Sequence, residues 1–442
     1  MKKYRFAIIV MIAVVLVAGC WWFFSSPGEF EAPDVQLMGS FQAVGRQGIL
    51  NVALKDDRTG LSRATLSITQ GDQTVTLVDT SFPGKAVHDK TLQVTIDPVA
   101  LKLKDGPAVL TISAEDRSLW RNKATLSKVI RIDVVPPQVF LLTPTNHVNP
   151  GGSCMIVYRA SKPLASSGVR VNDLSFPSYP ISLAGKPAYI AYFAMPLDTP
   201  PGGTQVRVFA RDQGGNEAIS GVPYLLLKKK FRNDKMSLSE RFLQQKMPEF
   251  VMVHPDLRDK SLIDVFAYVN AELRKSNDHT IREICRTSEA RQLWQDVFLR
   301  MKDAAPMAQF GDRRTWMYGG RVIGDSLHLG VDLASTAQAP IESANNGIVA
   351  FAGPLGIYGN TVIVDHGQGL FTLYAHLSDV STQKGQAVKR GETLGRSGLS
   401  GLAGGDHLHF SMIVAGQFVN PTEWWDAHWI ADNIQKKMPA SY

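Results

Sequence analysis

Cysteine is scarce in this sequence. Its three cysteines, Cys20, Cys154 and Cys285, lie far apart in 442 residues and outside the metal-ligand pattern described below. A disulfide framework is therefore not indicated. The helical H-E-x-x-H motif is also missing, so no glutamate base of that kind is available. Motifs of nucleic-acid-binding proteins are absent as well, and we expect no nucleic-acid partner.

Charge of one sign is not concentrated in the chain either. Charged residues make up 20% and hydrophobic residues 44%, with a formal net charge of +7, as in an ordinary folded protein. A modest positive charge suits an anionic surface, and it is equally common on a solvated surface with no partner. The length of 442 residues exceeds one ordinary core and indicates three or four domains.

The richest local pattern begins at His328. In the run from Leu327 to Ala334, apolar residues alternate with His328, Gly330 and Asp332, which is typical of a half-buried strand. Four residues of extended chain span about 13 Å, too far for His328 and Asp332 to hold one ion. We therefore expect the backbone to bend between them at Gly330.

A second strand pattern ends the same region. His407, His409 and Ser411 alternate with apolar residues and share one strand face, with the two imidazoles roughly 6–7 Å apart. His328, Asp332 and His409 together offer two imidazole nitrogens and one carboxylate, the three-ligand set that leaves the fourth position of zinc open for water. His376 and His407 remain as bases or hydrogen-bond donors beside that water.

These motifs resemble those of the lysostaphin-like, or LytM, zinc endopeptidases of family M23. The pattern H-x-G-x-D, then Y-A-H-L, then G-x-H-L-H-F occurs in order, and the glycine-rich run from Gly385 to Gly401 is similar to the connector of that family. The resemblance covers about residues 306 to 425. It implies Zn²⁺ on His328, Asp332 and His409, with His376 and His407 as the catalytic pair. Three positions depart from the usual pattern without removing a ligand: Ser400, Asp406 and Ser411.

The N-terminus carries the long hydrophobic run of the chain. Three basic residues precede nineteen uncharged and largely apolar ones, Phe6 to Phe24, enough to cross a bilayer at about 1.5 Å per residue. We predict that residues 1–26 are a transmembrane anchor or signal with the basic end in the cytoplasm. The aromatic run Trp21 to Phe24 suits the membrane interface and favours an uncleaved anchor.

Two alternatives to this single-pass inner-membrane protein with a periplasmic bulk remain open. The sequence V-A-G-C ending at Cys20 resembles a lipoprotein signal, and a plain secretory signal is the other option. All three place the bulk of the chain outside the cytoplasm.

The overall pattern predicts a mainly β, multidomain protein. Short alternating runs and an apparent repeat, Ala108–Asp116 with Gln205–Asp212, predict two immunoglobulin-like β-sandwiches at residues 33–136 and 137–230, serving as spacers or binding an envelope protein partner. Capping boxes at Ser237 and Thr280 and an amphipathic run from Ala290 to Met301 predict a helical linker or lid over 231–305. An all-β M23-type peptidase domain is expected at 306–430, followed by a tail at 431–442.

The resemblance to family M23 implies a zinc-dependent metalloendopeptidase that hydrolyses peptide cross-links of bacterial peptidoglycan. Links from D-alanine to diaminopimelate are the expected substrate of an outward-facing enzyme. The alternative is a non-catalytic wall-binding scaffold, or an activator of another wall hydrolase.

Overall fold

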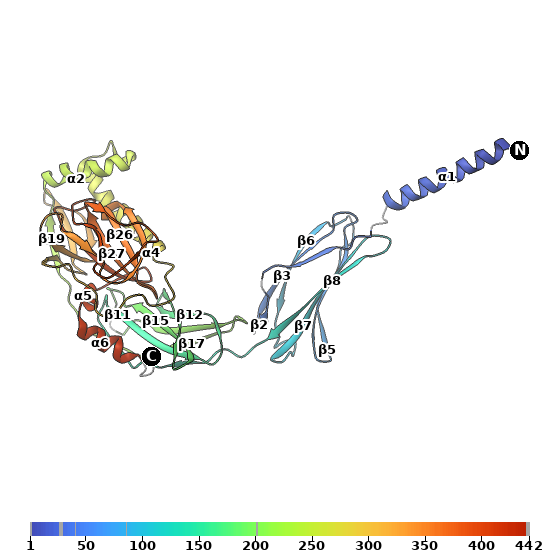
Figure 1. Cartoon of the computed structure of the whole chain (residues 1–442), viewed down its shortest axis with the longest axis horizontal. Coiled ribbons are helices and arrows are strands. Elements are labelled where there is room, and N and C mark those ends of the chain that lie inside the picture. The colour runs from blue at the N-terminus through green and yellow to red at the C-terminus, as the bar shows by residue number, and fades with distance from the viewer. Residues whose placement is uncertain (1, 26–29, 40, 85, 200–201, 439–442) are drawn as a thin grey trace. The chain divides into compact units, whose positions relative to one another are not determined.

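The protein is described from a computed structural model that covers residues 2–25, 30–39, 41–84, 86–199 and 202–438, and it is mostly β as predicted (Figure 1). The chain forms two compact units. The first contains residues 1–138 with the short stretches 162–165 and 211–218, and the second contains the rest.

The N-terminal run forms a single helix, α1, over Lys2–Ser25. Within the described part of the chain, no helix meets the length and hydropathy required of a membrane span. The basic side chains Lys2, Lys3 and Arg5 and the aromatic side chains Trp22, Phe23 and Phe24, on which the anchor prediction partly depends, lie outside the described side chains. The anchor stays a prediction.

The first β domain consists of two sheets packed face to face. Their strand orders are β1-β3-β6 and β2-β8-β7-β4-β5. Leu50 and Val52 from one sheet share a core with Leu66 and Ile112 from the other. Its immunoglobulin-like character stays a prediction. The strands are β1 Asp34–Leu37, β2 Ala43–Val44, β3 Gly48–Lys55, β4 Leu61–Gln70, β5 Gln73–Ser81, β6 Asp89–Ile96, β7 Gly106–Asp116 and β8 Lys123–Ile132.

The second β domain has two four-stranded sheets, β14-β15-β11-β9 and β13-β12-β16-β17, and a short pair β10-β18. Both strands of the predicted repeat end in an aspartate that accepts from a nearby backbone N–H, Asp116 from Ser118 N and Asp212 from Asn216 N. The repeat itself stays a prediction. The strands are β9 Val139–Leu141, β10 Asn146–Val148, β11 Ser153–Ala160, β12 Leu164–Val171, β13 Leu174–Pro177, β14 Tyr179–Leu183, β15 Lys186–Ala194, β16 Val206–Asp212, β17 Glu217–Gly221 and β18 Tyr224–Leu226.

A helical segment follows strand β19 (Asn233–Ser237) and differs in detail from the prediction. Ser239, not Ser237, caps the first helix, because its hydroxyl accepts from Phe242 N. Pro248 lies inside that helix instead of ending it. Thr280 caps nothing, because its hydroxyl bonds back to Ser276 O within the last helix. The elements are α2 Glu240–Val253, η1 Pro255–Leu257, α3 Leu262–Tyr268, the π-helical turn η2 Val269–Leu273 and α4 Arg274–Ile284.

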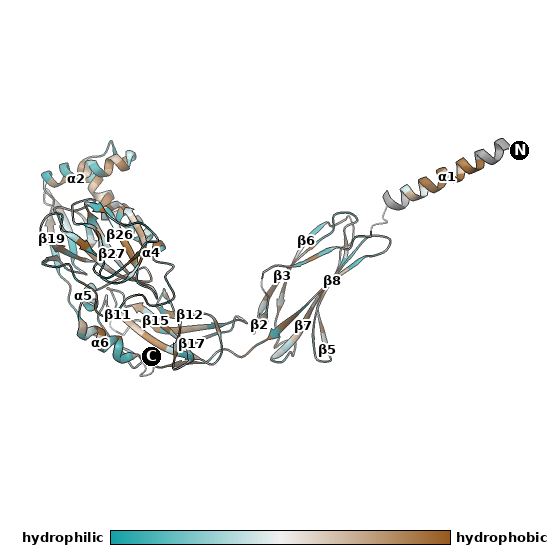
Figure 2. Ribbon diagram, viewed as in Figure 1, coloured by the Kyte–Doolittle hydropathy of each residue, from teal (hydrophilic) through white to brown (hydrophobic). Residues whose placement is uncertain are grey.

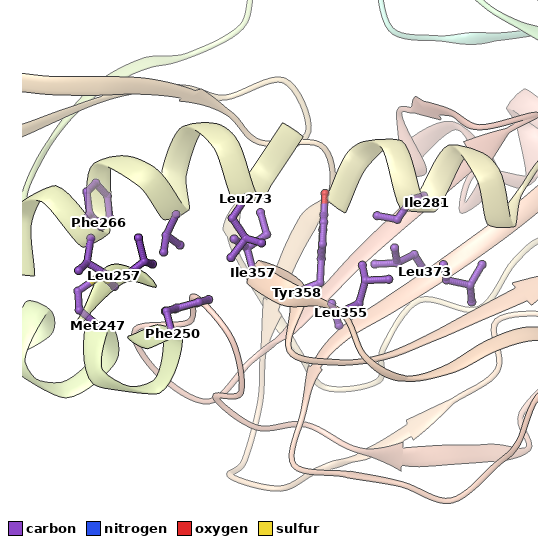
Figure 3. Close-up of a cluster of buried hydrophobic side chains, with 14 of the residues drawn as sticks. Met247, Phe250, Leu257, Phe266, Leu273, Ile281, Leu355, Ile357, Tyr358 and Leu373 are labelled. Carbon is purple, nitrogen blue, oxygen red and sulfur yellow. The ribbon is translucent and has the colours of Figure 1, made fainter. Parts of the chain in front are cut away.

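The helices share a hydrophobic core with the C-terminal sheet (Figure 3). Hydrophilic and hydrophobic residues both occur along α2 (Figure 2). The buried residues of this helix include Met247 and Phe250. Leu273 and Ile281 from the later helices pack with Tyr358 of the C-terminal domain. The segment is therefore an integral part of the second unit and not a free connection.

The amphipathic helix predicted between Ala290 and Met301 is wrong, because residues 285–304 form no helix. Their backbone N–H groups bond instead to distant parts of the C-terminal domain: Leu293 N donates to His366 O and Leu299 N to Ala344 O. Trp294 and Phe298 are nevertheless buried, in an aromatic cluster with Trp424. The helix-like spacing of apolar residues in this segment therefore reflects side chains that are buried at separate places along an irregular chain.

The C-terminal domain is built on one large sheet in the order β20-β23-β31-β27-β26-β25-β29, with β32 beside β31. Smaller sheets are β19-β21-β22 and β24-β30-β28. The elements are β20 Ala305–Ala308, β21 Arg313–Tyr318, β22 Arg321–Leu327, β23 Val331–Ala334, β24 Pro340–Glu342, β25 Gly347–Pro354, η3 Gly356–Tyr358, β26 Asn360–Asp365, β27 Leu370–Leu377, β28 Asp379–Val380, β29 Ala387–Val388, β30 Thr393–Arg396, β31 Leu408–Val414 and β32 Gln417–Val419.

Short helices end the described chain and contact the second β domain as well as the sheet. They are α5 Pro421–Trp424, α6 Ala427–Asn433 and η4 Gln435–Lys437. The indole of Trp424 donates to Ser153 Oγ at 2.9 Å and lies against Tyr192. The aromatic C-terminal stretch therefore joins the sheet to the preceding β domain.

Candidate metal centre and active site

Strand register brings the predicted ligands together. Asp332 on β23 is directly opposite His409 on β31, and His409 is opposite Ala375 on β27. His328 lies between β22 and β23, so the extended run predicted for residues 327–334 is interrupted where a bend was expected. Three neighbouring strands and one bend therefore converge on a single point.

The ligand atoms at this point lie within contact distance of one another. His328 Nε2 is 2.9 Å from Asp332 Oδ1 and 3.1 Å from His409 Nδ1, and His409 Nδ1 is 2.8 Å from Asp332 Oδ1. All three side chains are buried, and in the described part of the chain they form a group suited to hold a metal ion.

The outer hydrogen bonds determine which nitrogen carries the proton in each ring. His328 Nδ1 lies 2.8 Å from Gln309 O, which can only accept, so Nδ1 carries the hydrogen. Ser411 donates its hydroxyl hydrogen to Leu329 O and therefore accepts from His409 Nε2 at 3.1 Å. In the neutral rings, His328 Nε2 and His409 Nδ1 then present lone pairs toward Asp332 Oδ1. Three mutually facing acceptors match the donor set of a bound cation.

Gly330 is required here for space. A Cβ added to it would lie 2.6 Å from both His409 Nε2 and Phe410 O. Because real side chains do not approach so closely, only glycine lets the bend pass beneath the His409 ring. We expected Gly330 to supply conformational freedom, and the structure shows that close approach is what it provides.

His376 enters the site from a bulge at the end of β27. The pairing of β26 with β27 shifts register between Asn360 and Val362, and His376 has a φ of 63°, which is uncommon for a residue other than glycine. Its Nδ1 donates to Ser400 O at 2.9 Å, which leaves Nε2 as the acceptor. Its ring centroid lies 4.8 Å from that of His407.

His407 stands immediately before β31 at the edge of the same site. Its Nδ1 donates to Gly405 O at 2.8 Å, and its Nε2 lies 3.6 Å from Asp332 Oδ1. The structure thus brings together all five predicted residues, with the Nε2 atoms of His376 and His407 beside the metal-facing group.

Burial and neighbouring charges shift the pKa values of these groups in different directions. Burial lowers the pKa of His376 well below its usual value, and His407 and His409 lower it further. Burial also lowers the pKa of His409, to about 4. For His407, burial has a lowering effect that the hydrogen bond and charge of Asp332 outweigh, so its pKa is raised. Burial would raise the pKa of Asp332, but the charge and hydrogen bond of His328 and the hydrogen bonds of His407 and His409 place it well below its usual value.

The three departures from the family pattern each have a structural role. Ser400 Oγ donates to Leu377 O and accepts from Asn360 N, which holds the loop that orients His376. Asp406 accepts from Ser397 Oγ at 2.6 Å and so fixes the approach to His407. Ser411 supports His409 as described above. His366, by contrast, is buried away from this site and bonds to Asn346 O and Thr372.

A cavity of about 420 Å³ opens beside the metal-facing group. Its lining includes His376, His407 and the candidate ligands on one side, and residues of the helical segment on the other. Arg314 of β21, whose Nη2 lies 3.5 Å from Asp332 Oδ2, and Arg274 of α4 also line it. Neither arginine was predicted as a site residue, because their positions beside the cavity depend on strand and helix packing.

Comparison with known proteins agrees with this geometry. Residues 326–421 match the family described as peptidase family M23. A stretch of 95 residues is 42% identical to the DD-carboxypeptidase/endopeptidase Mpg of Neisseria meningitidis serogroup B, covering 22% of each chain. A stretch of 93 residues is 39% identical to the peptidoglycan DD-endopeptidase ShyA of Vibrio cholerae, covering 21% of this chain and 22% of that protein. The aligned part thus spans about a fifth of these curated relatives.

Among solved structures, the catalytic domain of the antimicrobial peptidase lysostaphin from Staphylococcus simulans is 25% identical. The match covers 28% of this chain and 92% of that domain, at a TM-score of 0.24. The family predicted from the H-x-G-x-D, Y-A-H-L and H-x-H motifs is confirmed by the sequence comparison. Residues 326–421 of this chain form a peptidase family M23 domain.

Proposed function

We propose that this chain is a zinc-dependent endopeptidase that hydrolyses peptide cross-links of bacterial peptidoglycan. The observation that supports it best is the set of three facing lone-pair atoms on His328, Asp332 and His409, each held by neighbours in a metal-ready form. The aligned relatives named as a peptidoglycan endopeptidase and a DD-carboxypeptidase/endopeptidase support the substrate class.

The residues fit zinc. Two neutral imidazole nitrogens and one carboxylate oxygen form a three-ligand set typical of catalytic zinc, and no fourth protein ligand completes the group within the described residues. When bound, zinc supplies a water of lowered pKa and polarises the scissile carbonyl.

His376 and His407 would carry the proton transfers. Each ring donates Nδ1–H to a backbone carbonyl and keeps Nε2 for the site, so each is held in a defined orientation. One Nε2 would accept the proton of the attacking water, and the other ring, in its protonated form, would donate a hydrogen bond from Nε2 to the oxygen of the tetrahedral intermediate.

The proposed place of action is outside the cytoplasm, with residues 1–26 as the anchor. The basic residues followed by a nineteen-residue apolar run support this placement. Peptide links from D-alanine to diaminopimelate would then be the accessible substrate.

The test uses the full-length protein in detergent with purified peptidoglycan, with and without a chelator, and mass spectrometry of the released muropeptides. We expect cross-linked dimers to fall to monomers only with metal present, and His409→Ala to abolish both zinc binding and cleavage. Bound zinc without any product would contradict hydrolysis and favour the alternative of a non-catalytic wall-binding protein. Absence of bound zinc would contradict the metal assignment itself.

A further inference from the structure

The cavity beside the metal centre contains positively charged side chains that have no role in the proposed hydrolysis. Its lining carries two guanidinium groups, Arg274 and Arg314, and a single carboxylate, that of Asp332. Arg314 lies 3.5 Å from Asp332 Oδ2, and a bound metal ion would share the charge of that carboxylate. Arg274 forms no direct ion pair among the described residues. A cavity of this composition favours an anionic ligand group.

Arg274 has no acidic partner of its own. Its Nε and Nη2 donate to Asn270 O and Asn270 Oδ1, each at 3.2 Å, and among the described residues it forms no ion pair. The nearby carboxylate of Asp278 accepts a hydrogen bond from Tyr358 OH at 3.3 Å, and its charge partly compensates that of Arg274 without a direct ion pair. Burial lowers the pKa of the Arg274 guanidinium, as expected for a cation held out of water without full compensation.

The backbone places Arg274 at an unusual point of the helical segment. The π-helical turn η2 ends at Leu273, directly before Arg274, and such turns are frequent at functional sites. Asn270 lies in the same turn, so the amide that orients the guanidinium and the guanidinium itself belong to one local structure.

The remainder of the lining is largely apolar. Phe242, Leu402 and Trp316 face the cavity together with Tyr358, whose ring lies 5.6 Å from that of His409. An aliphatic body would pack against these side chains while a charged end reached the arginines. The lining thus selects a residue that is aliphatic along its length and anionic at one end.

We propose that this cavity is a specificity subsite for a carboxylate of the substrate peptide, held by Arg274 and Arg314. The inference rests on the proposed function and adds a substrate feature to it. Guanidinium groups bind carboxylates through two parallel hydrogen bonds, which gives orientation as well as attraction. In a link from D-alanine to diaminopimelate, the carbon that bears the acylated amine also carries a free carboxylate, so the bound group would lie next to the scissile amide.

The test compares two cross-linked peptides that differ only in this group, one with the free carboxylate and one with the carboxamide. Binding is measured by fluorescence anisotropy on full-length, zinc-loaded protein carrying His407→Ala, so that cleavage does not interfere. We expect the acid to bind at least about tenfold more tightly than the amide, since a hydrogen bond to a charged group contributes about 1.5–3 kcal/mol. Arg274→Met should remove that preference by weakening only the acid, and Arg274→Lys should retain part of it.

The matched control is Arg258→Met, on the same helical segment but exposed and outside the cavity lining. It should leave the preference unchanged, and thermal melting should show that each variant is folded. Arg314→Met provides a second test should Arg274→Met not fold. Equal binding of the two peptides by the parent protein, or an unchanged preference in folded Arg274→Met, would overturn the subsite.

Cleavage by the wild-type enzyme separates this inference from the proposed function. Hydrolysis of both peptides at the same rate, with equal binding, keeps the endopeptidase and rejects the subsite. Binding that depends on Arg274 without any hydrolysis keeps the subsite and rejects the endopeptidase. Absence of binding for both peptides rejects the subsite together with the proposed substrate.

Discussion

The two imidazoles that face Asp332 are each fixed by a hydrogen bond on the far side of the ring. Gln309 O holds His328, and Ser411 Oγ holds His409. Such partners set the tautomer and the angle of a metal-binding ring. Ser411 is one of the three departures from the family pattern, and its hydroxyl holds His409 without adding a charge to the site.

Replacing Ser411 by alanine should weaken zinc binding. Ser411→Ala removes the acceptor of His409 Nε2–H and the donor to Leu329 O, so we expect zinc affinity to fall about 10–100-fold while the fold is retained. Competition with a chromogenic chelator measures this affinity. Ser381→Ala, at an exposed position away from the site, is the control. Equal affinities in the two variants would show that Ser411 does not position His409.

At the scale of elements, the bend between β22 and β23 depends on a glycine, Gly330, which has no side chain. Gly330→Ala would place a methyl group 2.6 Å from His409 Nε2 and from the backbone of Phe410. We expect zinc affinity to fall at least about tenfold, because the ring or the strand must move. Gly324→Ala is the matched control, since its added carbon would lie 3.5 Å from its nearest neighbour, Asn270 Nδ2. Unchanged zinc affinity in Gly330→Ala would contradict this account.

At the same scale, the helical segment shares its hydrophobic core with the C-terminal domain. Phe266 is fully buried and packs edge-on against Trp316. Phe266→Ala should therefore lower the free energy of unfolding of the second unit by about 3–5 kcal/mol without raising activity. Chemical denaturation and the peptidoglycan assay measure the two quantities, and Met252→Ala, at an exposed position of α2, is the control. Raised activity with unchanged stability would instead identify the segment as an inhibitory lid.

Sequence reasoning was most successful where chemistry and period-2 alternation coincide in a short stretch. His328, Asp332 and His409 could be chosen because each lies in such a stretch, and their side chains meet through strand register. The apolar residues of 290–301 are spaced as in a helix, although the segment is irregular. Their contacts, such as that of Phe298 with Trp424, are to residues far away in the sequence, which a local pattern does not reveal. The place of Arg274 in the site was not predictable for the same reason, since the residues that line the cavity with it are distant in the sequence.

On the scale of the whole second unit, Glu423 joins the C-terminal helices to the second β domain. Its Oε2 accepts from Ser153 N at 2.9 Å and from Ser153 Oγ at 3.1 Å. Burial raises the pKa of Glu423 to about 7. The folded protein therefore retains a proton that the unfolded chain loses near its ordinary pKa of 4.5.

The sign of the pH dependence follows from this difference. The contribution of Glu423 is most favourable below pH 4.5 and becomes less favourable as the pH rises to about 7. Glu423→Gln should remove this loss and gain stability over the wild type by about 2–3 kcal/mol at pH 8, with little gain at pH 4.5. Denaturation at the two pH values measures the gain. Exposed Glu272→Gln is the control, and a pH-independent difference would contradict the raised pKa.

The position of β31 has a consequence for timing. This strand lies between β23 and β27 in the sheet, yet it follows both in the sequence, and it carries His409. Before β31 is synthesised, β23 and β27 cannot pair directly, because they are not neighbours in the sheet. The candidate ligand His409 is also not yet present. The centre is complete only after residues 408–414 insert between them. The hydrolysis proposed above therefore requires that β31 has already joined the sheet.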